Sequence, residues 1–205
     1  MVANSVSWNP MEAANFVIAS EDTNVYSFDM RKMDKPKVVH EDHLNAVMSV
    51  DFSPTGEEFV SGSYDKTVRI FKVNQYKSRE VYFNKRMQRV FAAKFSLDGR
   101  FVFSGSDDTN IRVWKAVASE KMGILSKSES KSMDYCDKIK AKFRHMPQIK
   151  RISRHRQLPK SIYNAQKLKR TIKNAKKVRI QKYEERTKKP FPHRKNKKGV
   201  FAVID

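Results

Sequence analysis

Two stretches of the sequence, Val47–Lys72 (VMSVDFSPTGEEFVSGSYDKTVRIFK) and Val90–Lys115 (VFAAKFSLDGRFVFSGSDDTNIRVWK), align residue for residue and decide the fold. An earlier segment that begins at Val6 has the same form, with VSWNP followed by NFVIASEDTNVYSFD. Two sets of equivalent residues repeat at intervals of 43: Asp22, Asp65 and Asp108, and Phe28, Phe71 and Trp114. A fixed period of this length predicts one supersecondary unit per repeat.

Each repeat has the pattern of short strands separated by tight turns. The segments Ser53-Pro54-Thr55-Gly56 and Ser96-Leu97-Asp98-Gly99 have turn composition, because proline presets φ and glycine accepts positive φ. Val68 and Ile70 alternate with Thr67, Arg69 and Phe71, and this period of two predicts a strand with one buried face.

The 43-residue period and these turns resemble the WD-repeat family, whose repeats are four-stranded blades of a β-propeller. The resemblance covers most of residues 5–115 and implies a hydrogen-bond network in each blade, formed in that family by His, Ser or Thr, Asp and Trp. The matching residues are His43, Ser61 and Asp65 in the second repeat, and Ser104, Asp108 and Trp114 in the third. Phe71 replaces the second repeat's Trp, Arg86 stands where the third repeat's His is expected, and the first repeat supplies only Asp22 and Phe28. We interpret all of these residues as structural, so we expect them to stiffen turns and do no chemistry.

Three blades do not close a propeller, since closed ones have roughly four to eight. The expected fold is therefore a mostly β chain with a helical tail: a partial propeller of about three blades followed by a basic helical extension. Open sheet edges would remain at its ends, and these promote aggregation. We expect the chain to be the C-terminal portion of a longer protein, or to need a partner that supplies the remaining blades.

The positive charge is concentrated in the second part of the chain. The formal net charge is +21, yet residues 1–115 carry 16 Lys and Arg against 15 Asp and Glu. Such a cationic segment attracts polyanions, because neutralising phosphates releases their condensed counterions. Nucleic acid is the expected partner class, with an anionic membrane surface as the competing one.

Cysteine usage and hydropathy limit the cellular compartments and the kinds of stabilising site that the chain can have. Cys136 is the only cysteine, which excludes an internal disulfide framework and a cysteine-based zinc site. A reducing compartment is expected. No signal peptide is recognisable, and no apolar run approaches the roughly 18 residues of a membrane span.

Three parts are predicted: blades over residues 1–117, a linker over 118–132, and a basic helical domain with a disordered tail over 133–205. Helices are expected from about Ser128 to near Pro147, from Gln148 to Gln157, and from Lys160 to Lys188. The stretch Lys188–Lys198 is rich in Lys, Arg and Pro and is expected to be disordered until bound. The apolar residues 200–204 follow it.

The segment Pro147–Tyr163, PQIKRISRHRQLPKSIY, is the densest basic cluster and contains no acidic residue. Phosphate contacts from Arg and Lys would position it on RNA without reading sequence, and A-form RNA suits recognition by shape and charge. The alternative, a solvated nuclear-import signal alone, stays open. The candidate contacts, within this segment and the helix after it, are Lys150, Arg151, Arg154, His155, Arg156, Lys160, Lys167, Lys169 and Arg170.

This basic segment, together with WNPMEA, EDHLNAV, SPTGEEFVSGS, SREVY, KRMQRVF, SDDTNIRVWKA and ASEKMG, resembles the Sof-type WD-repeat proteins. The strongest match runs from Val47 to Tyr163. The resemblance implies a nucleolar scaffold of the small-subunit processome, with pre-ribosomal RNA, a box C/D small nucleolar ribonucleoprotein and other processome proteins as partners.

The resemblance also implies an alternative role, because the animal members are described as substrate receptors of a cullin-RING ubiquitin ligase. That role uses a Trp-Asp-x-Arg box, and this sequence has Phe28-Asp29-Met30-Arg31. Phe28, Asp29 and Arg31 are thus candidate contacts for the ligase adaptor. The competing interpretation is that these residues simply end a blade.

No enzyme motif is present: there is no Walker loop, no Gly-x-Ser-x-Gly elbow and no His-Glu-x-x-His. The irregular spacing of His145, His155 and His193 does not favour a metal site. We therefore expect no catalytic residue, metal, cofactor or small-molecule substrate. The resemblance to the Sof-type proteins implies a location in the nucleus and nucleolus.

Overall fold

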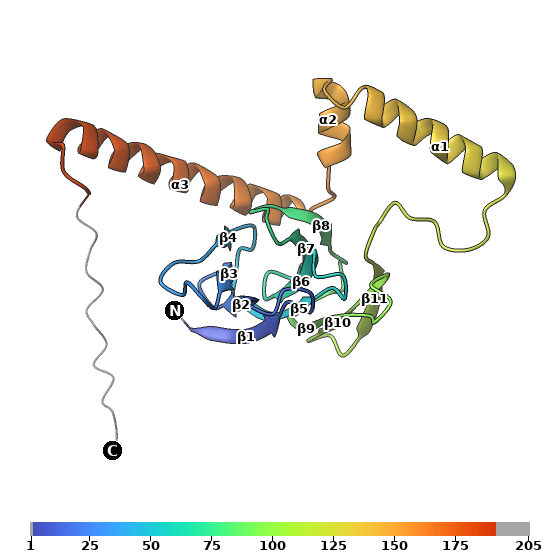
Figure 1. The fold of residues 1–205 in the computed structure, drawn as a ribbon, viewed down its shortest axis with the longest axis horizontal. Helices are drawn as coiled ribbons and strands as arrows, with labels where there is room; N and C mark the ends of the chain where they lie inside the picture. The colour runs from blue at the N-terminus through green and yellow to red at the C-terminus, as the bar shows by residue number, and fades with distance from the viewer. Residues whose placement is uncertain (1, 192–205) are drawn as a thin grey trace, which may run out of the picture. The chain divides into compact units, whose positions relative to one another are not determined.

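The computed structural model describes residues 2–191, and its first part consists of three antiparallel sheets (Figure 1). Blade 1 contains, in spatial order, β1 (Ala3–Trp8), β2 (Asn15–Ser20), β3 (Val25–Asp29) and β4 (Val38–His40). Blade 2 contains β5 (Val47–Phe52), β6 (Glu58–Ser63), β7 (Val68–Lys72) and β8 (Ser78–Tyr82). Blade 3 contains β9 (Val90–Phe95), β10 (Phe101–Ser106) and β11 (Ile111–Lys115). The predicted fold class, a partial three-bladed propeller with a helical extension, is confirmed.

The turn that joins the second and third strands has the same unusual backbone in every blade. Thr23, Lys66 and Thr109 have φ of 75°, 66° and 61°, and each directly follows the repeated Asp. Left-handed φ is costly for residues other than glycine, so the turn needs local support. In blade 2 the side chain of Asp65 supplies it by accepting the backbone N–H of Thr67 at 2.9 Å. In blade 1, Asp22 accepts the backbone N–H of Asn24 in the same way at 3.2 Å, whereas Asp108 in blade 3 accepts from the side chains of Asn110 and Arg112.

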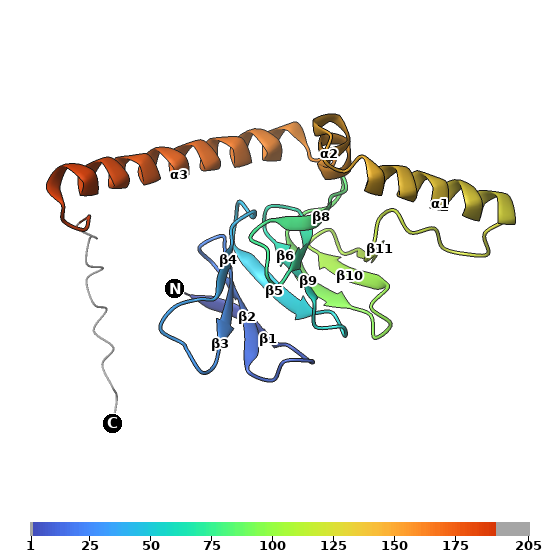
Figure 2. The same ribbon diagram turned by 45° about the horizontal axis from the view of Figure 1, so that its top comes forward.

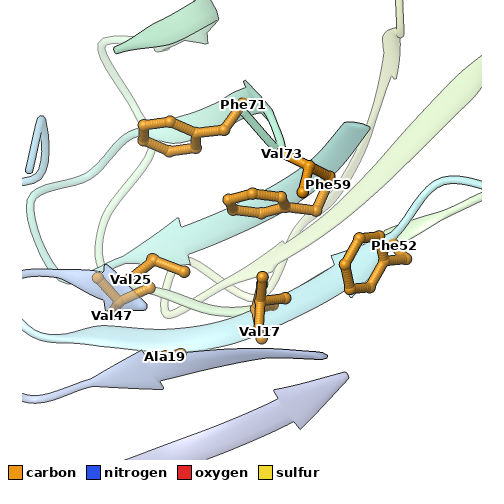
Figure 3. Packing of buried hydrophobic residues seen from close by; sticks show 9 residues of the cluster. Val17, Ala19, Val25, Val47, Phe52, Phe59, Phe71 and Val73 are labelled. Carbon is orange, nitrogen blue, oxygen red and sulfur yellow. The ribbon is translucent and has the colours of Figure 1, made fainter. Parts of the chain in front are cut away.

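The core lies between the blades, because each sheet is apolar on both faces. We call the face toward the preceding blade the leading face, and the face toward the following blade the trailing face. The trailing face of blade 1 meets the leading face of blade 2 in a cluster of valines and phenylalanines (Figure 3). Its members are Val17, Ala19, Val25, Val47, Val50, Phe52, Phe59, Phe71 and Val73. The equivalent cluster between blades 2 and 3 contains Val60, Val68, Ile70, Met87, Val90, Ala93 and Val102.

Hydrogen bonds at equivalent positions fix the spacing of the blades, which lie side by side in Figure 2. The Oγ of Ser7 accepts the backbone N–H of Phe52 at 3.3 Å. One repeat later, Oδ2 of Asp51 accepts the backbone N–H of Phe95 at 3.0 Å. In blades 1 and 2, the residue before the last one of the first strand therefore accepts a backbone N–H from the following blade.

The blade network is built most fully in blade 2. Nδ1 of His43 lies 2.9 Å from Oδ2 of Asp65, and its Nε2 lies 2.6 Å from Oγ of Ser61. Burial lowers the pKa of His43, so the ring is neutral and donates from Nδ1. Burial opposes ionisation of Asp65, but the His43 contact and the other donors outweigh it and hold its pKa below the usual range. Phe71 stands at the Trp position and has no N–H to extend the network.

Blade 3 keeps only part of this arrangement. Nε1 of Trp114 donates to Oγ of Ser104 at 2.8 Å. The carboxylate of Asp108 is instead bound by the guanidinium of Arg112, with Nη1 donating to Oδ1 at 3.0 Å, and this hydrogen bond holds the Asp108 pKa below its usual range. Arg86 is exposed, as expected for a residue that cannot replace the family's His in this network.

A second buried histidine, His40, joins blades 1 and 2. Its Nδ1 donates to the backbone carbonyl of Gln75 at 2.7 Å, and its Nε2 accepts from Oγ of Ser27 at 2.8 Å. Burial lowers its pKa to about 4, so the ring is neutral near pH 7. The sequence comparison of repeats did not identify this residue.

Three helices follow the sheets: α1 (Lys127–Lys142), α2 (Pro147–Arg154) and α3 (Lys160–Thr187). The first begins within one residue of the expected start, because Ser126 caps it and Glu129 accepts a hydrogen bond from the Ser126 backbone N–H, but it ends at Lys142, earlier than expected. The last residues of the expected linker 118–132 are therefore helical. The chain divides into two compact units, one up to Tyr163 and one from Asn164. Most of the expected disordered tail, and all of residues 200–204, lie outside the described residues.

We predict that Asp65→Ala destabilises the blades by roughly 3 kcal/mol, because it leaves His43 and two backbone N–H groups without their buried acceptor. The midpoint of urea unfolding measures this. The matched control is Asp107→Ala, an exposed Asp of the equivalent blade 3 turn, which should change stability by no more than about 0.5 kcal/mol. Equal effects of the two substitutions would contradict the assigned role of Asp65.

Candidate nucleic-acid interface

The basic segment Pro147–Tyr163 forms α2, a short extended connection and the first turn of α3. Pro147 suits the first position of α2, where no backbone N–H is needed. His155 has φ −64° and ψ 130°, so the helix stops there and the chain continues in extended form. Pro159 then precedes α3 and accepts the N–H of Tyr163 at 2.9 Å. Pro147 thus begins α2, and Pro159 ends the extended connection directly before α3.

The exposed surface of α2 is cationic. The side chains of Lys150 and Arg151 are exposed, and the following His155 is exposed as well. Arg154 is the last residue of α2. Because no Asp or Glu occurs between Pro147 and Tyr163, the positive potential of this segment is not neutralised from within.

A surface hollow lies where α1 and α2 meet, with a volume of about 620 Å³. It is lined by Arg144, His145, Lys150 and Ser153. Two permanent cations, an imidazole and a hydroxyl are hydrogen-bond donors suited to an anionic oxygen group. Sequence reasoning identified only Lys150 here. The other three were missed because the break at Pro147 brings residues together that no single helical periodicity relates.

Arg156 has a different role from its basic neighbours, because its guanidinium is bound within the chain. Its Nε lies 3.0 Å from Oε2 of Glu80 and donates to the carbonyl of Arg79 at 2.8 Å. Nη1 donates to the carbonyls of Ser153 and His155 at 3.0 and 2.8 Å. Arg156 therefore holds the end of α2 against strand β8.

The ion pair of Arg156 with Glu80 is continued by Arg79 and Glu58, so that basic and acidic side chains alternate. Nη1 of Arg79 lies 3.5 Å from Glu80, and its Nη2 donates to Oε2 of Glu58 at 2.7 Å. The same Nη2 also lies within 2.8 Å of the carbonyl of Ala116. Blade 2 thus binds the start of the basic region through an acidic side chain and a backbone carbonyl of β8.

The remaining predicted contacts lie on α3. Lys160 is exposed in its first turn. In the second unit, Lys167 and Arg170 are exposed and Lys169 is half-buried. The apolar stripe of this helix is also largely exposed, at Leu168, Ile172 and Val178. Such a surface has both charge and apolar contact area to offer a partner.

The candidate adaptor contacts lie at the end of β3. Phe28 stacks on Phe16, with ring centroids 5.8 Å apart, and is half-buried. Oδ1 of Asp29 accepts the backbone N–H of Arg31 at 2.9 Å, so Asp29 shapes the turn. The side chain of Arg31 is exposed, as are the neighbouring Met30 and Met33.

Within residues 2–191, no helix is long and apolar enough to cross a membrane. The same part of the chain contains no group of three or more His, Cys, Asp or Glu side chains that would hold a metal ion.

Comparison with known proteins identifies both parts of the chain. Residues 34–72 and 83–115 match the WD domain, G-beta repeat, and residues 116–200 match the Sof1-like domain. "DDB1- and CUL4-associated factor 13" of Xenopus tropicalis is 50% identical over 153 residues, which are 75% of this chain and 34% of that protein. "Protein SOF1" of Saccharomyces cerevisiae is 48% identical over 153 residues, 75% of this chain and 31% of that protein. The chain thus spans about a third of the length of the curated relatives it matches.

We predict that Arg156→Ala frees the end of α2 from β8. The coupling between Arg156 and Glu80 in a double-mutant cycle should be on the order of 1 kcal/mol, because the pair is only partly buried. Hydrogen exchange of the backbone amides around His155 should accelerate. Arg151→Ala, which removes an exposed charge of the same helix, should leave that exchange unchanged, and equal acceleration would contradict the anchoring role.

Proposed function

This chain belongs to the Sof1-like WD-repeat family, and we propose that it acts as a non-enzymatic scaffold in the biogenesis of the small ribosomal subunit. Its basic segment would bind pre-ribosomal RNA within a small nucleolar ribonucleoprotein, in contact with other processome proteins. A location in the nucleus and nucleolus goes with this role.

The observation that carries the proposal is that the residues that match the Sof1-like domain are also the residues that carry the positive charge. The match covers residues 116–200, where 27 Lys and Arg stand against 7 Asp and Glu from residue 116 onward. The blades, by contrast, are nearly neutral. This division suits a platform for protein contacts joined to a segment that follows a phosphate backbone.

The geometry of α2 favours RNA backbone contact over reading of bases. Its Lys150 and Arg151 are exposed charges on a short helix, and the hollow beside it presents Arg144 and Ser153 as further donors. Donors of this kind bind phosphate oxygens irrespective of sequence. Recognition by shape and charge is how folded RNA helices are commonly bound.

Substitution of both Lys150 and Arg151 by Gln should weaken RNA binding and make it less sensitive to salt. Each lost phosphate contact lowers the magnitude of the slope of log affinity against log salt by roughly 0.7 to 0.9. Filter binding or fluorescence anisotropy of a pre-ribosomal RNA fragment across a salt series measures the slope.

The matched control replaces two exposed lysines of the blades, Lys72 and Lys85, by Gln, which removes the same charge elsewhere. Arg156 is left intact because it holds α2 in place. The proposal fails if the control pair and the α2 pair lower the slope equally, or if neither does.

A second function is favoured by the exposed turn after β3. The vertebrate relatives are named for association with DDB1 and CUL4, and this chain presents Arg31 at the position that the ligase-receptor box requires. We therefore also propose that the chain binds a cullin-RING ligase adaptor through Phe28–Arg31. The apolar Met30 and Met33 beside Arg31 would add adaptable contact area.

In this second role, Arg31→Ala should reduce recovery of the adaptor in a pull-down by at least about tenfold, as expected for an interface arginine worth over 1.4 kcal/mol. Lys35→Ala, an exposed cation of the same loop, is the control. Recovery that is insensitive to Arg31 but present with the wild type would exclude this turn as the contact.

A further inference from the structure

Ser153 places a hydroxyl group inside the cationic segment. The residue is exposed and lies one position before the end of α2. Its Oγ donates to the carbonyl of Lys150 at 3.1 Å, a hydrogen bond within one turn of the same helix. Ser153 also lines the hollow between α1 and α2, together with Arg144, His145 and Lys150. An accessible hydroxyl group thus lies beside two permanent cations.

The residues before Ser153 have the charge pattern of a kinase substrate. Lys150 and Arg151 stand three and two positions before it, and the apolar Ile152 stands directly before it. No other Ser or Thr of this sequence has a basic residue at both of these positions. Kinases choose among serines by the charges that flank them. The pattern therefore suits a kinase that selects basic residues on the N-terminal side of the serine.

Helix α2 is short and buries little, which makes Ser153 available to a kinase cleft. It has eight residues, and Ile152 is 73% exposed. Helices of this length are marginal without burial of an apolar face, so local opening of α2 costs little free energy. The ion pair of Arg156 with Glu80, which holds the segment on β8, comes after Ser153 in the chain. Opening of α2 can therefore present Ser153 in extended form without breaking that pair.

The hollow has the volume and the charge to hold a phosphoryl group on Ser153. Its volume is about 620 Å³, and Arg144 and Lys150 supply two positive charges. A phosphoserine carries roughly −1.5 to −2 near pH 7 and three acceptor oxygens, and a guanidinium can bind two of these oxygens together. A phosphate near the C-terminal end of a helix is otherwise disfavoured by the last carbonyls. The two cations offset that repulsion.

We propose that Ser153 is phosphorylated by a serine kinase selective for basic substrates, and that its phosphate, bound by Arg144 and Lys150, releases RNA from the α2 segment. Oγ of Ser153 attacks the γ-phosphorus of ATP, the bond from that phosphorus to the bridging oxygen breaks, and ADP leaves. The hydroxyl proton passes to the catalytic Asp of the kinase. The phosphate occupies the donors that an RNA phosphate would use, and this effect rests on the proposed function.

Treatment of the full chain with the catalytic subunit of cyclic-AMP-dependent protein kinase and ATP tests the modification. Mass spectrometry should locate the phosphate at Ser153, and Ser153→Ala should abolish its uptake. Ser161 is the internal control, because it is an exposed serine of the same segment with Leu158 and Pro159 at the two selected positions. The inference is overturned if the folded chain takes up no phosphate, or if Ser153→Ala takes up as much as the wild type.

Phosphorus (³¹P) NMR of the phosphorylated chain tests whether the hollow binds the phosphate. Two neighbouring cations should lower the second pKa of the phosphoserine from about 6 to about 5. Arg144→Gln should raise that pKa again, whereas Lys131→Gln, which removes an exposed cation of α1 outside the hollow, should not. A phosphoserine pKa that stays near 6 in the wild-type chain would show that the hollow does not hold the phosphate.

The effect on RNA is measured with the pre-ribosomal RNA fragment across a salt series. Phosphorylation should weaken binding by roughly 10-fold or more and lower the salt slope by roughly 1.4 to 1.8, as for two lost phosphate contacts. The kinase-treated Ser153→Ala chain should bind like the untreated wild type, with circular dichroism as the check on its fold. Ser161→Glu, a negative charge in the same segment but outside the hollow, should weaken binding far less.

These measurements separate the failure of this inference from the failure of the proposed function. If the unmodified chain does not bind the RNA in a salt-dependent way, the proposed function fails and with it the release of RNA, while the NMR titration still decides whether the hollow binds the phosphate. If the unmodified and the phosphorylated chains bind RNA equally well, the proposed function stands and the release of RNA by phosphorylation is overturned.

Discussion

The packing of an aromatic leading face on a valine-rich trailing face is the contact on which the structure depends. No blade has a core of its own: Phe59 and Phe71 are buried because Val17 and Val25 of the preceding blade cover them. Each such interface removes the side chains of two sheets from water, at a gain of about 25 cal/mol for each Å² of apolar surface. The same rule that stabilises the middle blade leaves the outer faces of blades 1 and 3 in need of a neighbour.

Buried polar side chains add to this apolar packing, because their hydrogen bonds fix the turns within a blade and the position of one blade on the next. His43 and His40 are neutral and each makes two hydrogen bonds, so neither carries an unpaired charge into the core. Their lowered pKa values arise from burial, which means that the unfolded chain binds protons more readily below about pH 6.5. The blades consequently lose stability as the pH falls from 6.5 towards 4, the folded-state pKa of His40.

The fold was predictable to the extent that it repeats. The 43-residue period identified three blades and their turns, because equivalent positions meet equivalent environments. Features without a repeat were not predictable: His40 binds a carbonyl 35 residues away, and Arg156 binds Glu80 across 76 residues of sequence. Composition gave the cationic character of α2, but only the bend at Pro147 brings Arg144 beside Lys150. Local pattern thus predicts elements, whereas pairings between distant residues require the folded chain.

Blade 2 differs from its neighbours at the positions that hold the basic region. Glu58 of blade 2 corresponds to Asn15 in blade 1 and Phe101 in blade 3, and Glu80 corresponds to Lys37 in blade 1. The alternating chain Glu58–Arg79–Glu80 therefore exists only in blade 2, and only there can it receive Arg156. Equivalent positions of a repeat usually pack alike. We therefore attribute the acidic residues Glu58 and Glu80 of blade 2 to the orientation of α2 through Arg156. Arg156 thus positions the segment, while Lys150 and Arg151 of the same segment remain exposed.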